Sequence, residues 1–508
     1  MITARTIGAN GRLGNQLFQA AFLLAQAWRN NVKIGWREWE YARYFKGDFR
    51  PSLIPIAKTV IEPAFHCTPD FYESLDWSND IDFHGYFQSA KYWEGCEDLI
   101  RQSFSFSDEL TESVKGKNMA AIGKETIAIH IRRGDYVGNS AYVQLPPIYY
   151  LTALERHFPN WRKCNLVIFS DDSQYARMHF GCFQNAYFTD GSDIEDLCLM
   201  AMCNNHIIAN SSFSWWGAWL AGSKKVVRPE RHFAGKLAHH DTRDLYPAEW
   251  LSHEVERLDL SDVTFMIPVG YDSQDRVKNL ELVLDMLMCN FDTNIMVCEH
   301  NGDRFKWAAQ YADYSQFQSP YFHRTRMLNE MATESRTPII VNYDADVFMP
   351  PAQVMEAVKM IRDGMEVVYP YSGRFVRIPR KHYEPLKKSL DVGTLAGVNF
   401  PVLRPADNSS TGGCIFFDKE AFWRGGGENE NMVSFSPDDR ERFYRFTTLG
   451  FKVARTGGNL WHIEHFCGSN SGVNHPMMRA NKEEWAKVSK MGKGELEEYV
   501  SSWQSVAA

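Results

Sequence analysis

The strongest constraint on the fold is a strand–turn–helix pattern that occurs twice in the chain. The first occurrence begins with the β-like segment Thr3–Ile7, followed by a glycine-rich turn and then by helical periodicity from Gln16 to Arg29. The second begins at Val263–Val269, which is followed by helical periodicity from Arg276 to Met288. A single hydrophobic core rarely grows beyond about 250–300 residues. A chain of 508 residues that restarts the pattern therefore predicts two α/β domains.

A change in composition places the boundary between these domains. The stretch from Gly235 to Asp262 is polar, charged and rich in histidine. We therefore predict domains over residues 1–258 and 262–508, and we expect two different folds because the halves share no repeat in register. Further β-like runs in the first half alternate with helical stretches, which favours a parallel sheet covered by helices. These runs are Thr126–Ile131, Leu166–Ser170, His206–Ala209 and Lys225–Val227.

Composition excludes several classes of protein. The net charge of -8 offers no basic field for a nucleic acid. The 10 cysteines form no C-x-x-C pair, no signal peptide is visible, and no run of 18 apolar residues exists. We expect a reduced cytoplasmic protein without a transmembrane segment, for which peripheral contact with a membrane stays open. The 15 tryptophans suit stacking on sugars or bases, and they equally suit large cores.

The glycine-rich turn carries the first group of candidate substrate-binding residues. Glycines allow the backbone to approach a ligand closely, and a helix amino terminus favours an anion. The candidates are Gly11, Arg12, Gly14, Asn15 and Gln16. The pattern is neither G-x-G-x-x-G nor a P-loop. A plain turn between strand and helix is the alternative.

Two adjacent arginines follow the β-like run Thr126–Ile131. Arg132 and Arg133 stand at the carboxyl end of a strand, where α/β folds bind ligands. Guanidinium groups form bidentate hydrogen bonds with phosphate oxygens and stay charged at any working pH. His130 is a candidate substrate-binding neighbour. The alternative is a surface ion pair with Asp135, but the position at a strand end favours ligand binding.

A third polar segment follows the β-like run His206–Ala209. Its hydroxyl groups and amide can bind a diphosphate or a nucleotide, and its tryptophans are expected to pack beneath the site. The candidate substrate-binding residues are Asn210, Ser211, Ser212 and Ser214. A helix N-cap beside core aromatic residues is the alternative.

These segments stand in the order found in the α-1,2-fucosyltransferase family, glycosyltransferase family 11, which the first half of the chain resembles. The matching motifs are Gly11–Gln16, Gly85–Ser89, His130–Tyr136, Phe169–Asp172 and Asn210–Trp219, followed by a similar tail at Asp244–Trp250. The resemblance implies a GT-B-like (Rossmann-like) fold, GDP-fucose as donor and a galactose-type acceptor hydroxyl. It also implies inversion at the anomeric carbon without a metal.

The same resemblance implies roles for single residues. Arg132 and Arg133 would neutralise charge on the departing GDP, and Asn210 and the serines after it match donor-contacting positions. Asp135 has two open roles, the base that deprotonates the acceptor and a residue that orients an arginine. The lead-in Gly8–Asn10 is longer than in the family, which leaves the path of this loop open.

An acidic pair follows the apolar β-like run Ile339–Val341 in the second half. Residues two apart on a strand share a face, so Asp344 and Asp346 can hold one divalent cation. Carboxylate, water and phosphate oxygens suit Mg²⁺ or Mn²⁺, and the metal would stabilise a leaving diphosphate. A solvated turn is the alternative, since a lone Asp-x-Asp is common.

Residues 263–471 resemble the GT-A transferases, especially the region shared by galactosyl- and N-acetylgalactosaminyltransferases. Pro268, Asp272 and Arg276 follow the first strand, where such enzymes hold the nucleotide. The other motifs are Gly412–Phe417, Trp423, Gly425–Gly427, Asp438–Asp439, Arg442, Leu449–Phe451 and Trp461–His465. The resemblance implies a GT-A-like α/β domain with a UDP-sugar donor and Mn²⁺ or Mg²⁺.

Within this resemblance Asp438 matches the carboxylate that activates the acceptor. A histidine near the end of the motif completes the metal ligands, and His465 and His462 are the two candidates. A structural histidine pair is the alternative. The family's usual Glu-Asp-Asp begins with Pro437 here. The choice of base therefore stays open, with Glu428 and Glu430 upstream.

We therefore predict a bifunctional glycosyltransferase that adds two sugars to one surface glycan. The first half would transfer fucose, and the second would transfer a hexose or N-acetylhexosamine with metal. The partners would be nucleotide sugars and an oligosaccharide or glycolipid acceptor. A fucosyltransferase with a degenerate second domain and a non-catalytic glycan- or nucleotide-sugar-binding protein are the alternatives. The retained arginine and aspartate pairs argue against the last of these.

Overall fold

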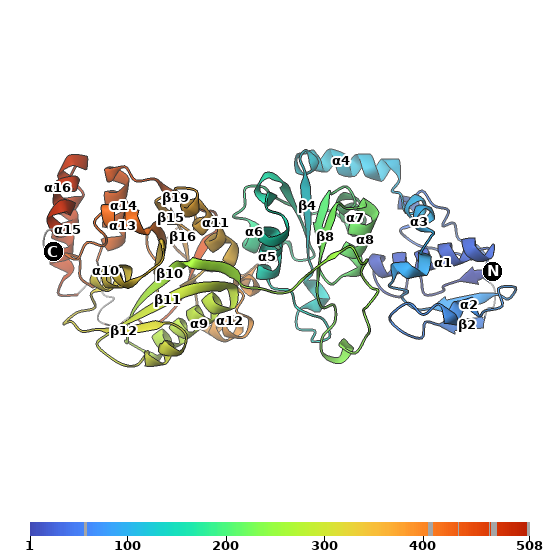
Figure 1. The fold of residues 1–508 in the computed structure, drawn as a ribbon, viewed down its shortest axis with the longest axis horizontal. Coiled ribbons are helices and arrows are strands. Elements are labelled where there is room, and N and C mark those ends of the chain that lie inside the picture. The colour runs from blue at the N-terminus through green and yellow to red at the C-terminus, as the bar shows by residue number, and fades with distance from the viewer. Residues whose placement is uncertain (55–57, 405–409, 435, 467, 469–474, 505–508) are drawn as a thin grey trace. The chain divides into compact units, whose positions relative to one another are not determined.

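The computed structural model describes residues 1–54, 58–404, 410–434, 436–466, 468 and 475–504 (Figure 1). The chain divides into two compact units. Unit 1 comprises Met1–Ala176 and Asn185–Val255, and unit 2 comprises Arg177–Gln184 and Glu256–Ala508. Residues 469–471, the end of the GT-A-like stretch, lie outside the described residues. Independent folding of the two halves stays a prediction.

Unit 1 contains a six-stranded sheet in which every strand is parallel to its neighbours. The strands are β4 (Thr126–Ile131), β5 (Asn165–Ser170), β6 (Ala186–Phe188), β7 (Asn205–Ile207), β8 (Lys225–Pro229) and β9 (Leu251–His253). Their spatial order is β6-β5-β4-β7-β8-β9. The order therefore runs outward in both directions from β4 and β7, as in Rossmann-like sheets.

A smaller parallel sheet, β1-β3-β2, completes the strands of unit 1. It contains β1 (Ile2–Thr3), β2 (Lys58–Ile61) and β3 (Ile81–His84). The helices that begin within unit 1 are α1 (Leu13–Asn30), α2 (Asp70–Glu73), α3 (Glu97–Ser103), α4 (Asp108–Ile122), α5 (Pro147–His157), α6 (Ser173–Phe180), α7 (Asp193–Met200) and α8 (Ser212–Ala221). The first strand is shorter than predicted, because the chain turns after Thr3 with backbone hydrogen bonds from Ile7 and Ala9.

Aromatic packing joins α1 to α8 in unit 1. Phe18 on α1 lies 4.6 Å from the ring of Trp215 and 5.1 Å from that of Trp216, both on α8. Trp215 and Trp216 are fully buried, as predicted for residues beneath a site. Large aromatic side chains contribute much of the apolar area that a core buries. This packing fixes the first turns of the two helices beside each other.

Unit 2 is built on a seven-stranded mixed sheet in the order β12-β11-β10-β13-β18-β15-β19. Its strands are β10 (Leu258–Gly270), β11 (Phe291–His300), β12 (Asp313–Phe317), β13 (Ile339–Tyr343), β15 (Val367–Tyr369), β18 (Cys414–Asp418) and β19 (Val453–Arg455). Only β18 is antiparallel to its neighbours. The strand order reverses between β10 and β13, which creates a second switch point.

A four-stranded sheet and eight α-helices complete the described part of unit 2. The sheet, β14-β20-β16-β17, contains β14 (Val347–Phe348), β16 (Arg374–Ile378), β17 (Val402–Arg404) and β20 (Asn459–Ile463). The helices are α9 (Gln274–Asn290), α10 (Arg324–Glu334), α11 (Pro351–Arg362), α12 (Tyr383–Ser389), α13 (Lys419–Arg424), α14 (Asp438–Leu449), α15 (Met478–Val488) and α16 (Lys493–Gln504). Helices α15 and α16 pack on α14.

The second domain was predicted to begin at residue 262, which lies inside β10. The strand begins earlier, at Leu258, because Leu258 and Leu260 are buried while Asp259 and Ser261 are exposed. That alternation is typical of a half-buried strand, although the segment is polar overall. A cut between the units belongs before Leu258.

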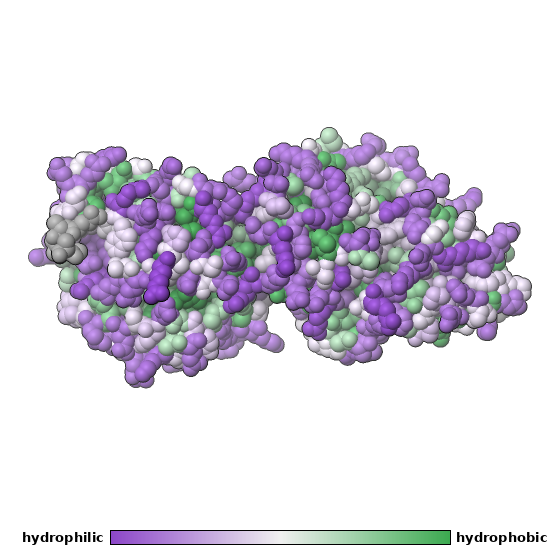
Figure 2. All heavy atoms as spheres, viewed as in Figure 1, coloured by the Kyte–Doolittle hydropathy of each residue, from purple (hydrophilic) through white to green (hydrophobic). Residues whose placement is uncertain are grey.

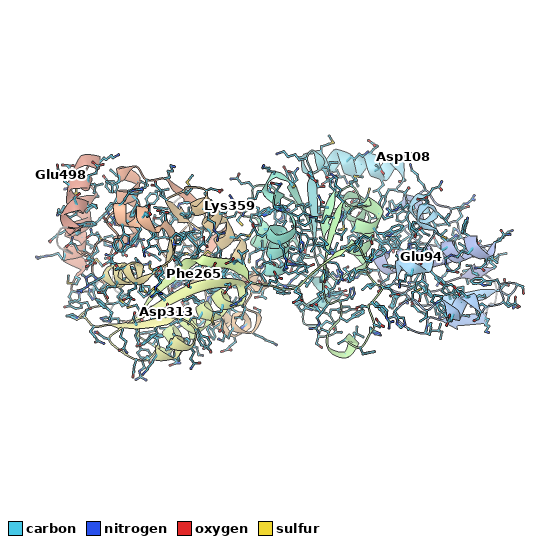
Figure 3. The ribbon with its side chains drawn as sticks, viewed as in Figure 1. Glu94, Asp108, Phe265, Asp313, Lys359 and Glu498 are labelled. Carbon is cyan, nitrogen blue, oxygen red and sulfur yellow. The ribbon has the colours of Figure 1, made fainter. Side chains whose placement is uncertain are left out.

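The surface is polar and the sheet centres are apolar. The face shown in Figure 2 is mostly hydrophilic, with apolar residues scattered over it. In Figure 3 the charged side chains of Asp108 and Glu498 lie at the outside, whereas Phe265 on β10 is fully buried. Among the described residues, no helix combines the length and apolar character that crossing a membrane requires.

Candidate active sites

A cavity of about 730 Å³ lies in unit 1 where the strand order of the large sheet reverses. The segments after β4 and β7, which are neighbouring strands, both line it. Ligands of open α/β sheets bind at the carboxyl ends of strands at such a switch point. The predicted residues that line the cavity are Gly11, Arg12, Gly14, Asn15, His130, Arg132, Asp135, Ser211 and Ser212.

Two helix amino termini meet at this cavity. Helix α1 begins at Leu13 and α8 at Ser212, and both residues line the cavity. A Cβ atom on Gly14 would lie 2.6 Å from the backbone nitrogen of Phe213, so only glycine allows the two helix ends to approach this closely. Each helix end presents free N–H groups and a partial positive charge. Together they form a site for an anion.

Asn15 holds the two helix ends in register. Its side-chain oxygen accepts hydrogen bonds from the Ser212 hydroxyl at 2.7 Å and from the Gln88 amide at 2.7 Å. Ser211 caps α8 by accepting a hydrogen bond from the backbone N–H of Phe213 at 3.3 Å. These contacts fix the cavity wall before any ligand binds.

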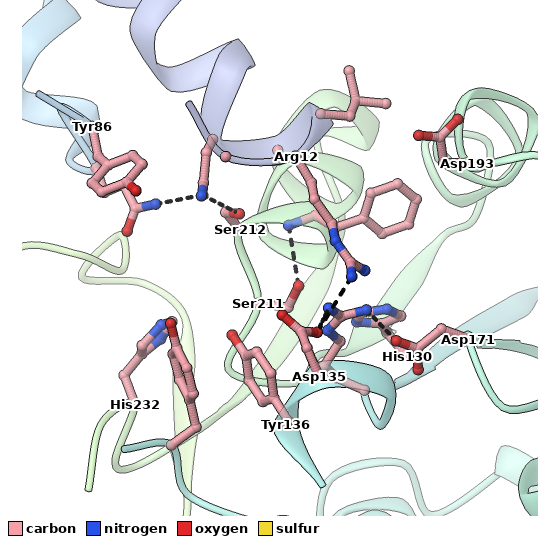
Figure 4. A pocket seen from close by; sticks show the side chains of 18 of the residues that line it. Arg12, Tyr86, His130, Asp135, Tyr136, Asp171, Asp193, Ser211, Ser212 and His232 are labelled. Atoms are coloured by element: carbon pink, nitrogen blue, oxygen red, sulfur yellow. Dashed lines mark hydrogen bonds and ion pairs between the residues drawn. The ribbon is translucent and has the colours of Figure 1, made fainter. Parts of the chain in front are cut away.

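Arg132 lines the cavity within a network of charges that includes Asp135 and Asp171, which Figure 4 labels. Its guanidinium forms ion pairs with Asp171 and Asp135 and lies 5.1 Å from the ring centroid of Tyr136. Arg12 lies 3.6 Å from Asp135. Two cations therefore face the cavity on either side of one carboxylate, at the helix ends described above.

The adjacent Arg133 points elsewhere. Its guanidinium lies 3.9 Å above the ring of Tyr175 and its Nε is 3.9 Å from Asp172. Arg133 is not among the residues that line the cavity. Strand β4 ends at Ile131, and Arg133 has φ of -127° and ψ of -94°, so the backbone leaves the extended conformation there and the two arginine side chains point in different directions.

His130 is buried at the cavity wall, and its ring lies 5.5 Å from that of Phe213. Burial, with a smaller contribution from Arg132, lowers the pKa of His130 to about 3. The imidazole is therefore neutral at physiological pH. Its Nδ1 has no hydrogen-bond partner among the described residues. A neutral ring nitrogen can donate or accept a hydrogen bond with a ligand.

Three predicted residues instead hold the backbone behind the cavity. The amide of Asn210 donates to the carbonyl oxygens of Val143 at 3.1 Å and His232 at 2.8 Å. Ser214 donates to the Ser211 carbonyl at 3.3 Å. Gln16 donates to the Gly11 carbonyl at 2.9 Å. Asn210, Ser214 and Gln16 are absent from the cavity lining.

Sequence reasoning missed several residues of the cavity. Acidic side chains line it at Asp171, Asp193 and Asp196, and aromatic side chains line it at several positions. The loop after β6 and the start of α7 supply two of the carboxylates. The acidic stretch that follows a short β-like run was a usable signal, because β6 ends at the same edge of the sheet as β4 and β5.

Replacing Asp196 with Asn should stabilise the protein at neutral and higher pH. Burial raises the pKa of Asp196 from 3.8 to about 7. The folded state therefore binds the proton more tightly, and this stabilisation is lost as the pH rises from about 4 to about 7. The substituted amide carries no charge, so the variant should gain up to about 4 kcal/mol at about pH 8.

Thermal unfolding at about pH 5 and pH 8 measures this difference, which should be much smaller at the lower pH. The exposed Asp70→Asn is the matched control. Equal gains for Asp196→Asn at both pH values would contradict a buried carboxyl group with a raised pKa.

The second candidate site lies in unit 2 at the carboxyl ends of β10 and β13. Asp346 is buried, with His465 Nε2 at 3.1 Å and His462 Nε2 at 3.6 Å. Ligand atoms of these three residues all lie within 4.8 Å of one another. Although burial opposes it, His462 and Arg276 hold the pKa of Asp346 well below its usual range. Asp346 and the two histidines can therefore share one cation.

The two aspartates of the predicted metal pair make different contacts. Strand β13 ends at Tyr343, so Asp344 and Asp346 lie in the turn that follows and share no strand face. Asp344 instead lies 2.9 Å from Arg324, which is also 2.8 Å from Asp438. In the part of the chain that the structure describes, Asp344 is not a member of the metal-binding group.

Arg276, on α9, occupies the space between the predicted nucleotide residues and Asp346. It forms an ion pair with Asp346 and lies 3.3 Å from both Asp272 and His465 Nδ1, whose proton points to the Phe466 carbonyl oxygen at 2.6 Å. Pro268 is buried within β10, two residues before the strand ends at Gly270. The structure thus brings Asp272 and Arg276 to the histidine site, whereas Pro268 lies in the sheet.

The two aspartates at the start of α14 differ in exposure. The Asp438 side chain is 10% exposed and is held by Arg324 and by the Ser436 hydroxyl at 2.9 Å. The Asp439 side chain is 36% exposed. Burial and the neighbouring Asp438 raise the pKa of Asp439 to about 6. Asp439 is therefore a second candidate for the general base beside the predicted Asp438.

The upstream glutamates are engaged in structure. Glu428 is fully buried, with Arg442 at 2.7 Å and a hydrogen bond from Asn342. Glu430 accepts a hydrogen bond from Asn329 at 2.9 Å. A buried ion pair of this kind holds its partners in place. Neither contact leaves the glutamate facing the histidine site.

Unit 1 is an α/β unit with a cavity, lined by two helix amino termini, at the switch point of a Rossmann-like sheet. Residues 1–254 match the model of glycosyl transferase family 11. The chain therefore belongs to glycosyltransferase family 11 and is a glycosyltransferase similar to the α-1,2-fucosyltransferases. This family assignment confirms the resemblance predicted for the first half.

The relatives give the extent of this similarity. The chain is 34% identical over 184 residues to the O-antigen biosynthesis glycosyltransferase WbnK of Escherichia coli, covering 32% of this chain and 61% of that protein. It is 28% identical over 249 residues to an alpha-1,2-colitosyltransferase of the same species, covering 41% and 85%. Fucosyltransferase NodZ from Bradyrhizobium aligns at 13% identity and a TM-score of 0.32, over 46% of this chain and 95% of that one. That structural similarity is too low to carry an argument.

Proposed function

We propose that unit 1 transfers fucose from GDP-fucose to a galactose-type hydroxyl during synthesis of a surface glycan. The observation that carries this proposal is the convergence of Arg132 and two helix amino termini on one cavity. Charge develops on the diphosphate as the sugar leaves, and preorganised N–H groups and a guanidinium stabilise that charge. The name of WbnK supports a role in O-antigen synthesis.

The acidic part of the cavity suits the guanine base. Asp193, the first residue of α7, lines the cavity there. Guanine presents adjacent N–H donors on its Watson–Crick edge, and an ionised carboxylate accepts two such hydrogen bonds. Uracil lacks that pair of donors. A carboxylate here therefore favours GDP over UDP.

Calorimetric titration of the protein with GDP-fucose, GDP-mannose and UDP-galactose tests this function. We expect GDP-sugars to bind and donor hydrolysis to follow GDP-fucose. Colitose, the sugar named for one relative, is the alternative donor sugar, and GDP-colitose distinguishes it. Binding of UDP-galactose alone would overturn the assignment of the cavity in unit 1.

For unit 2 we infer a GT-A-like transferase domain that uses a UDP-sugar and a divalent cation. Asp346, His462 and His465 would hold the cation, which supplies positive charge against a leaving diphosphate. Two imidazoles and one carboxylate suit Mn²⁺ better than Mg²⁺, which prefers oxygen ligands. Arg276 would lie beside the diphosphate, and Asp439 would receive the proton of the acceptor hydroxyl.

A unit 2 without catalytic activity is the second candidate, and one observation favours it. Arg276 and Arg324 already pair with Asp346 and Asp344, so each carboxylate has a protein cation beside it. A bound metal would have to displace or share the contact of Arg276 with Asp346. Binding of Mn²⁺ by the protein decides between the two candidates.

A further inference from the structure

The cavity of unit 1 has an aromatic side that the donor chemistry leaves unused. We call it the aromatic wall, and its members are Phe65, Tyr136, Tyr142, Phe233 and His240. All are partly exposed. Tyr136 and Tyr142 stack at 4.0 Å, Tyr142 lies 5.8 Å from Phe233, and Phe65 lies 5.0 Å from Phe233. The rings therefore form one continuous surface that faces the cavity.

Backbone contacts make this surface rigid. Tyr142 and Phe233 form an isolated antiparallel β-bridge, and the Ala234 N–H donates to the Ala141 carbonyl at 2.8 Å. Gly235 has φ of +46°, and a Cβ atom there would lie 2.5 Å from the Ser140 carbonyl oxygen. A residue with a side chain would force the two loops apart.

Asn210 holds the same two loops from below. Its amide donates to the carbonyl oxygens of Val143 and His232, the neighbours in sequence of Tyr142 and Phe233. Its backbone carbonyl, which does not depend on the side chain, accepts a hydrogen bond from the Tyr136 hydroxyl at 3.0 Å. Asn210 is therefore connected to three parts of the wall while staying outside the cavity lining.

The wall lies on the opposite side of the cavity from Asp193. In Figure 4, Tyr136 and His232 lie away from Asp193, and Arg12, Asp135 and the two serines lie between them. The Arg132 guanidinium is 5.1 Å from the Tyr136 ring, so the wall begins beside the anion site. A GDP-sugar with its base at the acidic side and its diphosphate in the middle would place its sugar beside the wall.

We propose that the aromatic wall is the acceptor subsite and stacks a pyranose ring of the acceptor glycan. This rests on the proposed function of unit 1. A pyranose has a face of C–H groups, which the negative face of an aromatic ring attracts. Small-molecule sites combine such apolar surfaces with a few fixed polar groups. Asn210 is a positioning residue for this subsite.

Steady-state kinetics with GDP-fucose test the proposal, using whichever of methyl β-galactoside, methyl β-glucoside and methyl N-acetyl-β-galactosaminide the wild type fucosylates fastest. Tyr142→Ala and Phe233→Ala should raise the acceptor KM about tenfold or more, with the Kd of GDP within about twofold of wild type. Phe233→Tyr keeps the ring and should retain most of the affinity. Trp28→Ala, on an exposed ring of α1, is the matched control.

Asn210→Ala should also raise the acceptor KM more than it lowers kcat, while the affinity for GDP is retained. A donor-contacting Asn210, as the sequence predicts, would lose GDP affinity instead. Saturation-transfer NMR of the same pyranosides measures contact with the wall without turnover. Circular dichroism checks that each variant is folded.

An unchanged acceptor KM in the Tyr142 and Phe233 variants would overturn the proposal, as would pyranoside contacts in NMR that are equal in wild type and variants. A parallel loss of GDP affinity would show that the wall binds the guanine base of the donor, and this result would overturn the proposal as well. Failure of the wild type to bind GDP in calorimetry identifies a failure of the proposed function. The NMR comparison still tests the wall in that case.

Discussion

Replacing Arg132 with Ala should lower fucose transfer by about 10²–10³-fold or more in protein that is still folded at the assay temperature. Arg132 lies in the cavity beside two helix amino termini, and its removal leaves the charge of departing GDP without its guanidinium partner. Arg132→Lys should recover little, because an ammonium group cannot reproduce the planar fork of hydrogen bonds. Transfer of labelled fucose and thermal unfolding measure the two effects.

Arg133→Ala is the matched control and should behave differently. The Arg133 side chain is 16% exposed, stacks on Tyr175 and does not line the cavity. Its removal should lower the unfolding temperature and reduce activity much less than Arg132→Ala. Equal losses of activity in the two variants at equal stability would show that both arginines contact the donor. Full activity of Arg132→Ala would remove the proposed anion site.

Strands that are buried on both faces could be predicted from sequence, whereas polar or short strands could not. All six residues of β4 are buried, and the predicted run Thr126–Ile131 matches its bounds. The start of β10 is polar apart from two buried leucines, so the sequence predicted that this strand begins at Val263 rather than at Leu258. The antiparallel pairing of β18 with β13 joins residues far apart in sequence, which local periodicity does not encode.

The candidate sites show the same limit at the level of single side chains. Strand ends and turn residues indicated which segments surround the cavity, because carboxyl ends of parallel strands meet at one edge of a sheet. The direction of each side chain past a strand end depends on the local turn. The sequence therefore could not predict that Arg132 rather than Arg133 lines the cavity, or that Asp346 rather than Asp344 lies with the two histidines. The acidic and aromatic residues of the cavity come from loops whose position only the fold sets.

Removal of metal should abolish any sugar transfer by unit 2 and spare fucose transfer by unit 1. In unit 1, Arg12 and the two helix ends add positive charge beside Arg132, whose own charge Asp135 and Asp171 offset. In unit 2, Asp346 would repel a diphosphate unless a cation lies between them, and one guanidinium from Arg276 only offsets the charge of Asp346 itself. EDTA should therefore lower the second activity to background, and Mn²⁺ should restore it.

Asp346→Asn should mimic the chelator, with Mn²⁺ binding reduced about tenfold or more, because it removes the charged member of the ligand group. Asp344→Asn should have a smaller effect, since Asp344 pairs with Arg324 outside that group. Asp313→Asn, an exposed carboxylate on β12, is the matched control. Electron paramagnetic resonance of Mn²⁺ measures binding without any assay of turnover.

Full transfer by unit 2 in EDTA would contradict a metal-dependent site. Unchanged Mn²⁺ binding by Asp346→Asn would show that the ion binds elsewhere. A wild type that binds no Mn²⁺ would favour a unit 2 without catalytic activity, in which Arg276 and Arg324 are the permanent partners of the two aspartates.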